Sequence, residues 1–100
     1  MNLLPMKLIT IVCEAYARDA VTKLLLEVGA QGWTLFPVEG HGSQGHRAAD
    51  IPESANIQVE VVIKTEAAHI LLERLDSECF ERYAMIAFQS DVHVLRAQKF

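Results

Sequence analysis

Apolar and polar positions change their spacing several times along the chain. Residues 6–13 form an almost unbroken run of apolar and β-branched side chains, which predicts a buried strand. From residue 17 to residue 28 the apolar positions recur at steps of three and four, as in a helix with one buried face. Gly29 follows, where such a helix commonly ends. Residues 33–38 predict a second strand, and Pro37 places it at a sheet edge or near the strand's end.

The second half of the chain repeats this order. Residues 57–63 begin with strand alternation and then become wholly apolar. Thr65 is a suitable cap for the helix that the next apolar positions predict. Residues 84–88 predict a fourth strand, and residues 92–96 predict a short fifth strand.

Two strand-helix-strand units of similar length predict an α+β domain of the ferredoxin-like type, βαββαβ. Right-handed crossovers place the four main strands in one antiparallel sheet with both helices on one face. At 100 residues the chain is one domain, residues 1–100. The strands are apolar on both sides, as Val61 and Val62 show. Because an uncovered apolar face promotes association, we expect it to pack against other copies of this chain.

Residues 39–56, between the two halves, differ in composition from the rest. They hold three of the five glycines and mostly small or polar side chains, so they cannot bury a face. A connection of this length in a small domain is usually functional, and we expect a mobile loop. Residues 40–47 read GHGSQGHR: glycine N–H groups can point at an anion, and Arg47 offers a forked donor. The segment matches neither a Walker A loop nor a dinucleotide fingerprint.

Charge and cysteine usage exclude several classes of protein. Nine basic and thirteen acidic residues give a net charge of −4, which argues against broad nucleic-acid binding. The sequence shows neither an apolar run long enough to cross a bilayer nor a signal peptide. Cys13 and Cys79 lie far apart and form no C-x-x-C pair, so we expect buried free thiols in the cytoplasm.

Two stretches resemble the PII signalling superfamily, and within it the PII-like proteins linked to inorganic-carbon acquisition and carboxysomes. Residues 27–34 (EVGAQGWT) are similar to a family motif, and residues 38–43 (VEGHGS) are similar to the start of the family's T-loop. The similarity runs from Met6 to about Arg96. It implies a ferredoxin-like homotrimer whose sheets face inward, with adenine nucleotides bound in the clefts between subunits.

Carried over by position, the resemblance implies a nucleotide site. Its residues are Val12, Thr34 and Val62 near the adenine, Gly40, Gly42, Ser43 and Gln44 at the ribose and phosphates, and Arg96 reaching the phosphates from near the C-terminus. The resemblance also suggests bicarbonate as a second ligand, held by Arg47 and by loop N–H groups such as that of Gly45. No metal site is expected, because His41 and His46 lie in a loop with no regular spacing to fix a coordination geometry.

The chain departs from the family pattern at two places. The segment before the fourth strand, residues 79–84 (CFERYA), has no glycine or lysine, whereas nitrogen-sensing members hold ATP phosphates there with both. We therefore expect ADP or AMP to be favoured over ATP. The loop contains no tyrosine, so control by uridylylation is not expected.

Three functions remain open from the sequence. The leading hypothesis is a non-catalytic sensor whose loop becomes ordered when nucleotide and bicarbonate bind, with a bicarbonate transporter or carboxysome-linked protein as partner. The alternative is a trimeric divalent-cation-binding protein of the copper tolerance type, with Cys13, His41 and His46 as ligands. A third is a small enzyme of the dimeric ferredoxin-like barrel group, although no acid–base pair is evident in the sequence.

Overall fold

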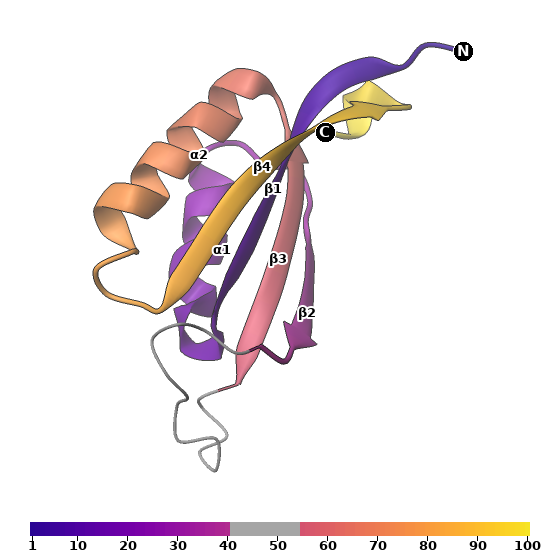
Figure 1. Ribbon diagram of the computed structural model, residues 1–100. Helices are drawn as coiled ribbons and strands as arrows, with labels where there is room; N and C mark the ends of the chain where they lie inside the picture. Colours follow the sequence, from indigo (N-terminus) through magenta and orange to yellow (C-terminus); the bar gives the residue numbers. More distant parts are fainter. Residues whose placement is uncertain (41–54) are drawn as a thin grey trace.

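The computed structural model describes residues 1–40 and 55–100 (Figure 1). Its main elements, in chain order, are β1 (Leu4–Glu14), α1 (Arg18–Glu27), β2 (Thr34–Val38), β3 (Asn56–Ile63), α2 (Thr65–Glu78) and β4 (Met85–Val94). A 3-10 turn, Ala15–Ala17, links β1 to α1, and a second one, Ala97–Lys99, follows β4. The longest described helix has 14 residues, and no described helix is long and apolar enough to cross a membrane.

The four strands form one antiparallel sheet in the order β2-β3-β1-β4. Both helices lie together on one side of it (Figure 1). This is the predicted ferredoxin-like arrangement, and the α+β fold class is confirmed. The first strand is central because β1 pairs with both β3 and β4.

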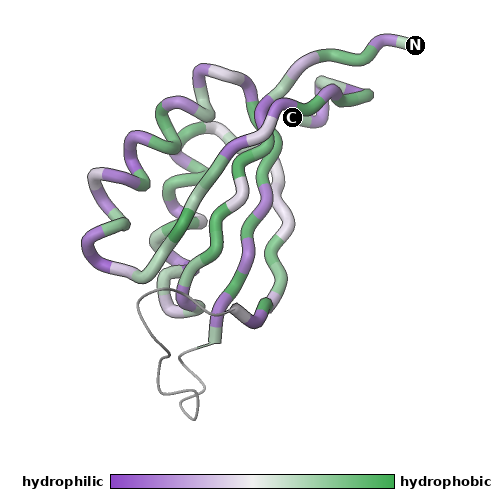
Figure 2. The backbone as a smooth tube through the Cα atoms, viewed as in Figure 1, coloured by the Kyte–Doolittle hydropathy of each residue, from purple (hydrophilic) through white to green (hydrophobic). Residues whose placement is uncertain are grey.

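The core lies between the helices and one face of the sheet. From β1 and β3, Ile9, Ile11 and Val59 are fully buried on this side. They meet Leu25 of α1 and Leu71 of α2, which are equally buried. The hydrophilic residues of α2 lie along its outer side (Figure 2), as expected of a helix whose stability comes from one buried face.

Two expectations about the second half are wrong. The predicted fifth strand, residues 92–96, does not exist separately, because β4 runs unbroken from Met85 to Val94 and pairs with β1 over that length. The polar residues 89–91, which resemble a turn, lie within the strand because β1 satisfies their backbone groups. Thr65 is the first helical residue, and Lys64 before it is the N-cap, without a side-chain cap hydrogen bond.

Candidate ligand-binding surface

The side of the sheet opposite the helices, here called the open face, carries every second strand residue. Since Ile9, Ile11 and Val59 point into the core, their sequence neighbours point to the other side. The register places the open-face residues Leu8, Thr10 and Val12 of β1 beside Gln58, Glu60 and Val62 of β3, Thr34 and Phe36 of β2, and Ile86 and Phe88 of β4. Ile86 is 62% exposed and Phe88 is 52% exposed. The described chain therefore leaves large apolar side chains of this face exposed.

The three residues expected near an adenine all project from the open face. Val12 lies opposite Gln58, Thr34 lies opposite Glu60, and Val62 lies opposite Leu8. Val12 and Val62 are half-buried, and Thr34 is exposed. The fold thus gathers on one surface three residues that are far apart in the sequence.

A polar strip crosses the middle of this apolar surface. Thr34, Glu60 and Thr10 lie side by side on β2, β3 and β1. The carboxylate of Glu60 accepts a hydrogen bond from Gln58 Nε2 at 3.1 Å. The sequence alone did not show which way Glu60 faces, and the register places it on the open face. The strip supplies hydrogen-bonding groups that a purely hydrophobic interface would lack.

Gly40 and Arg96 lie beyond opposite ends of the sheet. Gly40 follows Val38, which pairs with Asn56 at the end where β1 finishes. Arg96 follows Val94, which pairs with Leu4 at the end where β1 begins. The eleven residues of β1 span about 35 Å between these ends. Within one protomer the two residues are therefore too far apart to contact the same mononucleotide.

The backbone conformation favours glycine at position 29 but not at position 40. Gly29 has φ +88° and ends α1 in a Schellman motif, in which Ala30 N donates to Leu25 O at 2.9 Å and Gly29 N donates to Leu26 O at 3.1 Å. At Gly40 an added Cβ would meet no atom of the described chain within 4 Å. The described part of the fold therefore does not require glycine at position 40.

The remaining predicted site residues lie outside the described part of the chain. They are Gly42, Ser43, Gln44, Gly45 and Arg47. His41 and His46, two of the three expected copper ligands, lie there as well.

An aromatic cluster that the sequence did not predict lies at the loop end of the sheet. Tyr16 and Tyr83 meet edge to face with ring centroids 5.2 Å apart, and the guanidinium carbon of Arg82 lies 5.5 Å from the Tyr83 centroid. Beside them, Ala15 N donates to Ala55 O at 2.8 Å, where the loop re-enters the sheet. No local sequence signal joins Tyr16 to Tyr83, because only the fold brings them together.

Cys13 is a core residue, as expected of a buried free thiol. It and Cys79 are each 2% exposed and both are free. Burial, together with the neighbouring Cys79, raises the pKa of the Cys13 thiol to about 11. Since metals bind the thiolate, this environment opposes the copper-tolerance interpretation. Residues 1–40 and 55–100 contain no group of three or more His, Cys, Asp or Glu that could hold a metal ion.

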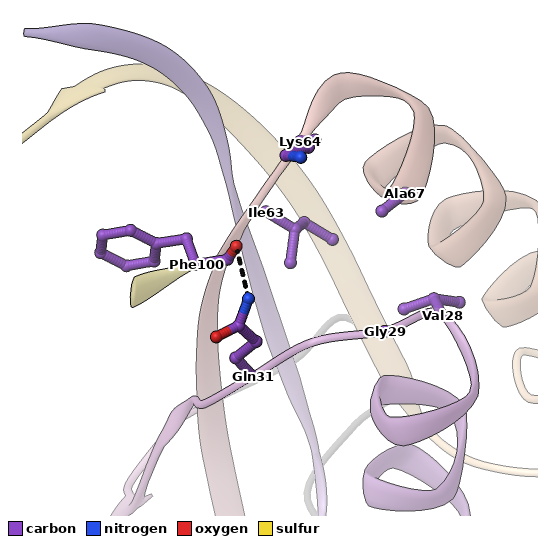
Figure 3. Close-up of a pocket in the computed structure, with 7 residues that line it drawn as sticks. All are labelled: Val28, Gly29, Gln31, Ile63, Lys64, Ala67 and Phe100. Carbon is purple, nitrogen blue, oxygen red and sulfur yellow. Dashed lines mark hydrogen bonds between the residues drawn. The ribbon is translucent and has the colours of Figure 1, made fainter. Parts of the chain in front are cut away.

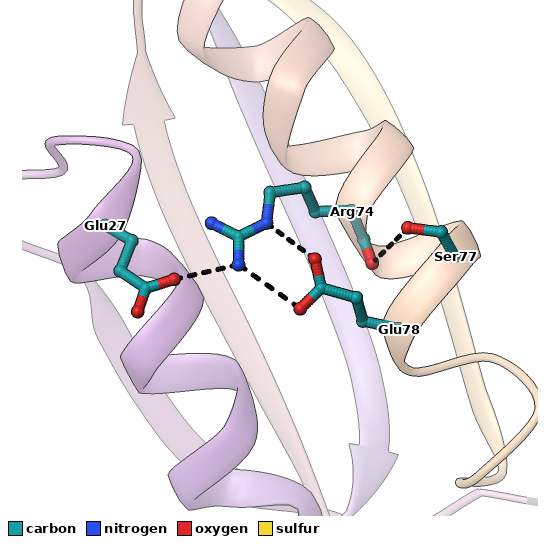
Figure 4. Close-up of polar contacts among 4 residues, drawn as sticks. All are labelled: Glu27, Arg74, Ser77 and Glu78. Carbon is teal, nitrogen blue, oxygen red and sulfur yellow. Dashed lines mark hydrogen bonds and ion pairs between the residues drawn. The ribbon is translucent and has the colours of Figure 1, made fainter.

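On the helix side of the sheet, the guanidinium of Arg74 links the two helices (Figure 4). Arg74 of α2 reaches Glu27 at the end of α1 at 2.8 Å and contacts Glu78 of its own helix at 2.7 Å. Hydrogen bonding to Arg74 lowers the pKa of the Glu78 carboxyl. The contact fixes the end of α1, from which residues 28–33 lead to Thr34.

Comparison with known proteins gives one family. The family model described as Nitrogen regulatory protein P-II matches residues 6–99. A PII-like signalling protein of Thermus thermophilus is similar over 100% of this chain and 99% of that chain, with 39% identity and a TM-score of 0.86. CPII of Thiomonas intermedia, in its structure bound to ADP, AMP and bicarbonate, is similar over 99% of this chain and 96% of that chain, with 28% identity and a TM-score of 0.88. Its structure bound to ADP and bicarbonate matches with 29% identity over 99% and 97% of the two chains, at a TM-score of 0.87.

Proposed function

Because this chain belongs to the nitrogen regulatory protein P-II family, we propose that it is a PII-like regulator that binds an adenine nucleotide between the subunits of a homotrimer. One observation carries the proposal: the predicted adenine residues share the open face, which also presents the exposed apolar side chains of Ile86 and Phe88. A surface of this kind favours burial against copies of the same chain. Trimers with inward-facing sheets bury it.

The positions of Gly40 and Arg96 support a site shared between two subunits. They follow opposite ends of the sheet, so one subunit cannot bring both to a single nucleotide. We assign Thr34, Val62 and Arg96 to one subunit. Its neighbour supplies Val12, near the adenine, together with Gly40 and the loop residues Gly42, Ser43 and Gln44, which approach the ribose and phosphates from the other side.

We expect ADP or AMP as the main ligand, with bicarbonate as a second ligand. CPII, which is similar over nearly the whole chain, has been solved with ADP, AMP and bicarbonate. Residues 79–84 lack the glycine and lysine that would favour a third phosphate. Arg47 and the Gly45 N–H suit a small planar anion.

The proposed output is a change in the T-loop, residues 39–56. Ligand binding orders this loop and so alters the surface offered to a partner, to the extent that the ligand binds the ordered loop more tightly. The chain acts in the cytoplasm, and its partner is a bicarbonate transporter or a carboxysome-linked protein. The regulated process is inorganic-carbon acquisition. The proposal includes no catalysis, no metal and no nucleic acid.

Isothermal titration of the purified chain with AMP, ADP and ATP, each with and without bicarbonate, tests this function. We expect ADP or AMP to bind more tightly than ATP, and bicarbonate to strengthen that binding by about fivefold or more. Arg47→Ala should abolish the bicarbonate effect and keep most of the nucleotide affinity. Arg18→Ala, which removes an exposed arginine from α1, is the matched control and should leave both unchanged. Absence of heat with every nucleotide at millimolar concentration would falsify the proposal.

A further inference from the structure

Arg96 has an unusual backbone conformation. Its φ of 57° and ψ of 53° are left-handed, and it is the only non-glycine residue with a positive φ among residues 1–40 and 55–100. A non-glycine residue in this conformation costs free energy, and it persists only where the surrounding structure holds it. Here the chain reverses into a turn, in which Lys99 N donates to Arg96 O at 2.9 Å and Phe100 N donates to Ala97 O at 3.0 Å. Residues 96–100 are called the closing turn below.

One side chain attaches the closing turn to the rest of the described fold. Gln31 Nε2 donates to the main-chain oxygen of Phe100 at 3.1 Å (Figure 3). Phe100 and Gln31 also line a partly open pocket of about 180 Å³, together with Val28 and Ala67. Among the residues that the structure describes, no second hydrogen bond ties residues 97–100 to another element. The Gln31 amide is therefore the main polar restraint on where this turn lies.

Gln31 is itself held on a rigid base. The Schellman motif at Gly29 sets the direction in which the chain leaves α1, and Arg74 pins Glu27 at the end of that helix. Gln31 precedes Thr34 by three residues. Its amide thus links the segment that carries Thr34 to the turn that carries Arg96, although β2 and β4 lie at opposite edges of the sheet.

The Arg96 side chain is available to a ligand. It is exposed, and no carboxylate of the described chain lies within ion-pair distance of it. Arg74, in contrast, is occupied by two carboxylates. A guanidinium with no competing carboxylate is free to pair with the oxygens of a phosphate.

We propose that Gln31 is a positioning residue: by anchoring the closing turn, it sets the place of the Arg96 backbone from which the guanidinium reaches a nucleotide phosphate. This rests on the nucleotide site proposed above and adds a residue to it. Gln31 itself touches no ligand in this scheme. Its contribution therefore disappears when the Arg96 side chain is absent, which a merely structural contact would not do.

A double-mutant cycle on the full chain, read by titration with ADP, tests the inference. Gln31→Met removes the amide donor at nearly constant length, and Arg96→Gly removes the guanidinium while keeping a residue that adopts positive φ freely. We expect Arg96→Gly to weaken ADP binding about tenfold or more, and Gln31→Met to weaken it about threefold. The double variant should bind like Arg96→Gly alone. Lys99→Ala, in the same turn, is the charge-matched control and should stay within about twofold of the unmodified chain.

The outcomes separate the two proposals. If the unmodified chain binds no nucleotide, the function itself is wrong. If it binds and the Gln31 and Arg96 effects multiply, Gln31 acts independently of Arg96 and the positioning role is overturned. The positioning role is also overturned if Lys99→Ala weakens binding as much as Arg96→Gly, because general charge would then explain both. Unchanged melting temperatures of the single variants show that each remains folded.

Discussion

The two faces of the sheet are built from the same strands and have opposite environments. On the helix side, Ile9 and Ile11 are fully buried. On the open face, Ile86 and Phe88 of the neighbouring strand β4 are each more than half exposed. The helix side completes the core of a single chain. The open face combines exposed large apolar side chains with a polar strip, so the difference indicates where a second surface is expected to bind.

The largest effect is expected from the helix side. Ile11→Ala should lower the free energy of unfolding by about 2–5 kcal/mol, because it removes a fully buried side chain and leaves a cavity. Urea unfolding at low protein concentration measures this. Ile86→Ala on the open face is the comparison and should cost less than about 1 kcal/mol within the protomer, since its side chain is 62% exposed. Equal losses at the two positions would mean that the faces do not differ as described.

The open face should instead control assembly. Phe88→Glu places a charge on the β4 part of the open face, which the proposed trimer buries, and desolvating an unpaired carboxylate there is costly. Light scattering coupled to size exclusion should show the variant at the protomer mass of 11.2 kDa, with the unmodified chain at three times that mass. Ile70→Glu is the matched control, because Ile70 is 49% exposed on α2, away from the sheet. A trimer that survives Phe88→Glu but not Ile70→Glu would place the interface on the helices.

The smallest effect concerns the ion pairs, which among the described residues lie on the helix side of the sheet and on the helices. A hydrogen bond from Lys7 lowers the pKa of Asp91 below its ordinary 3.8, and one from Arg74 lowers the pKa of Glu78 below its ordinary 4.5. A carboxyl with a lower pKa in the folded state stabilises the fold above these ordinary values. That stability is lost as the pH falls through the folded-state pKa.

Urea midpoints measured from pH 6 downward should therefore decline below about pH 4.5, and Asp91→Asn with Glu78→Gln should flatten the decline. Both carboxyls are exposed, so the shift should be small. Asp19→Asn, an exposed carboxyl in the first turn of α1, is the control. A decline that is as steep in the double variant as in the unmodified chain would show that these pairs contribute nothing.

The sequence predicts the fold well because its signals are local. The change from apolar runs to three- and four-residue spacing marks the helices, and Gly29 marks the end of α1 where the structure has it. The prediction was wrong at β4, because the polar residues 89–91 resemble a turn and only their pairing with β1 keeps them extended. Long-range pairing of this kind leaves no mark in the neighbouring residues.

The candidate site was predicted less completely. Val12, Thr34 and Val62 were expected together from the family resemblance, and the register brings them to one face. The sequence could not show that Gly40 and Arg96 lie beyond opposite ends of that sheet. Nor could it reveal the contact between Gln31 and Phe100, since it joins an amide and a main-chain oxygen from opposite halves of the chain.

The central position of β1 also governs when the protein can fold during synthesis. This strand is made first, yet its two neighbours are β3 and β4, and β4 is made last. A ribosome must therefore release nearly the whole described chain before Leu4 can meet Val94. Until then one edge of β1 has no partner, and contacts this distant in sequence close slowly. A pause in translation before β4 would thus leave the unpaired edge of β1 exposed, where chaperones or other nascent chains can bind it.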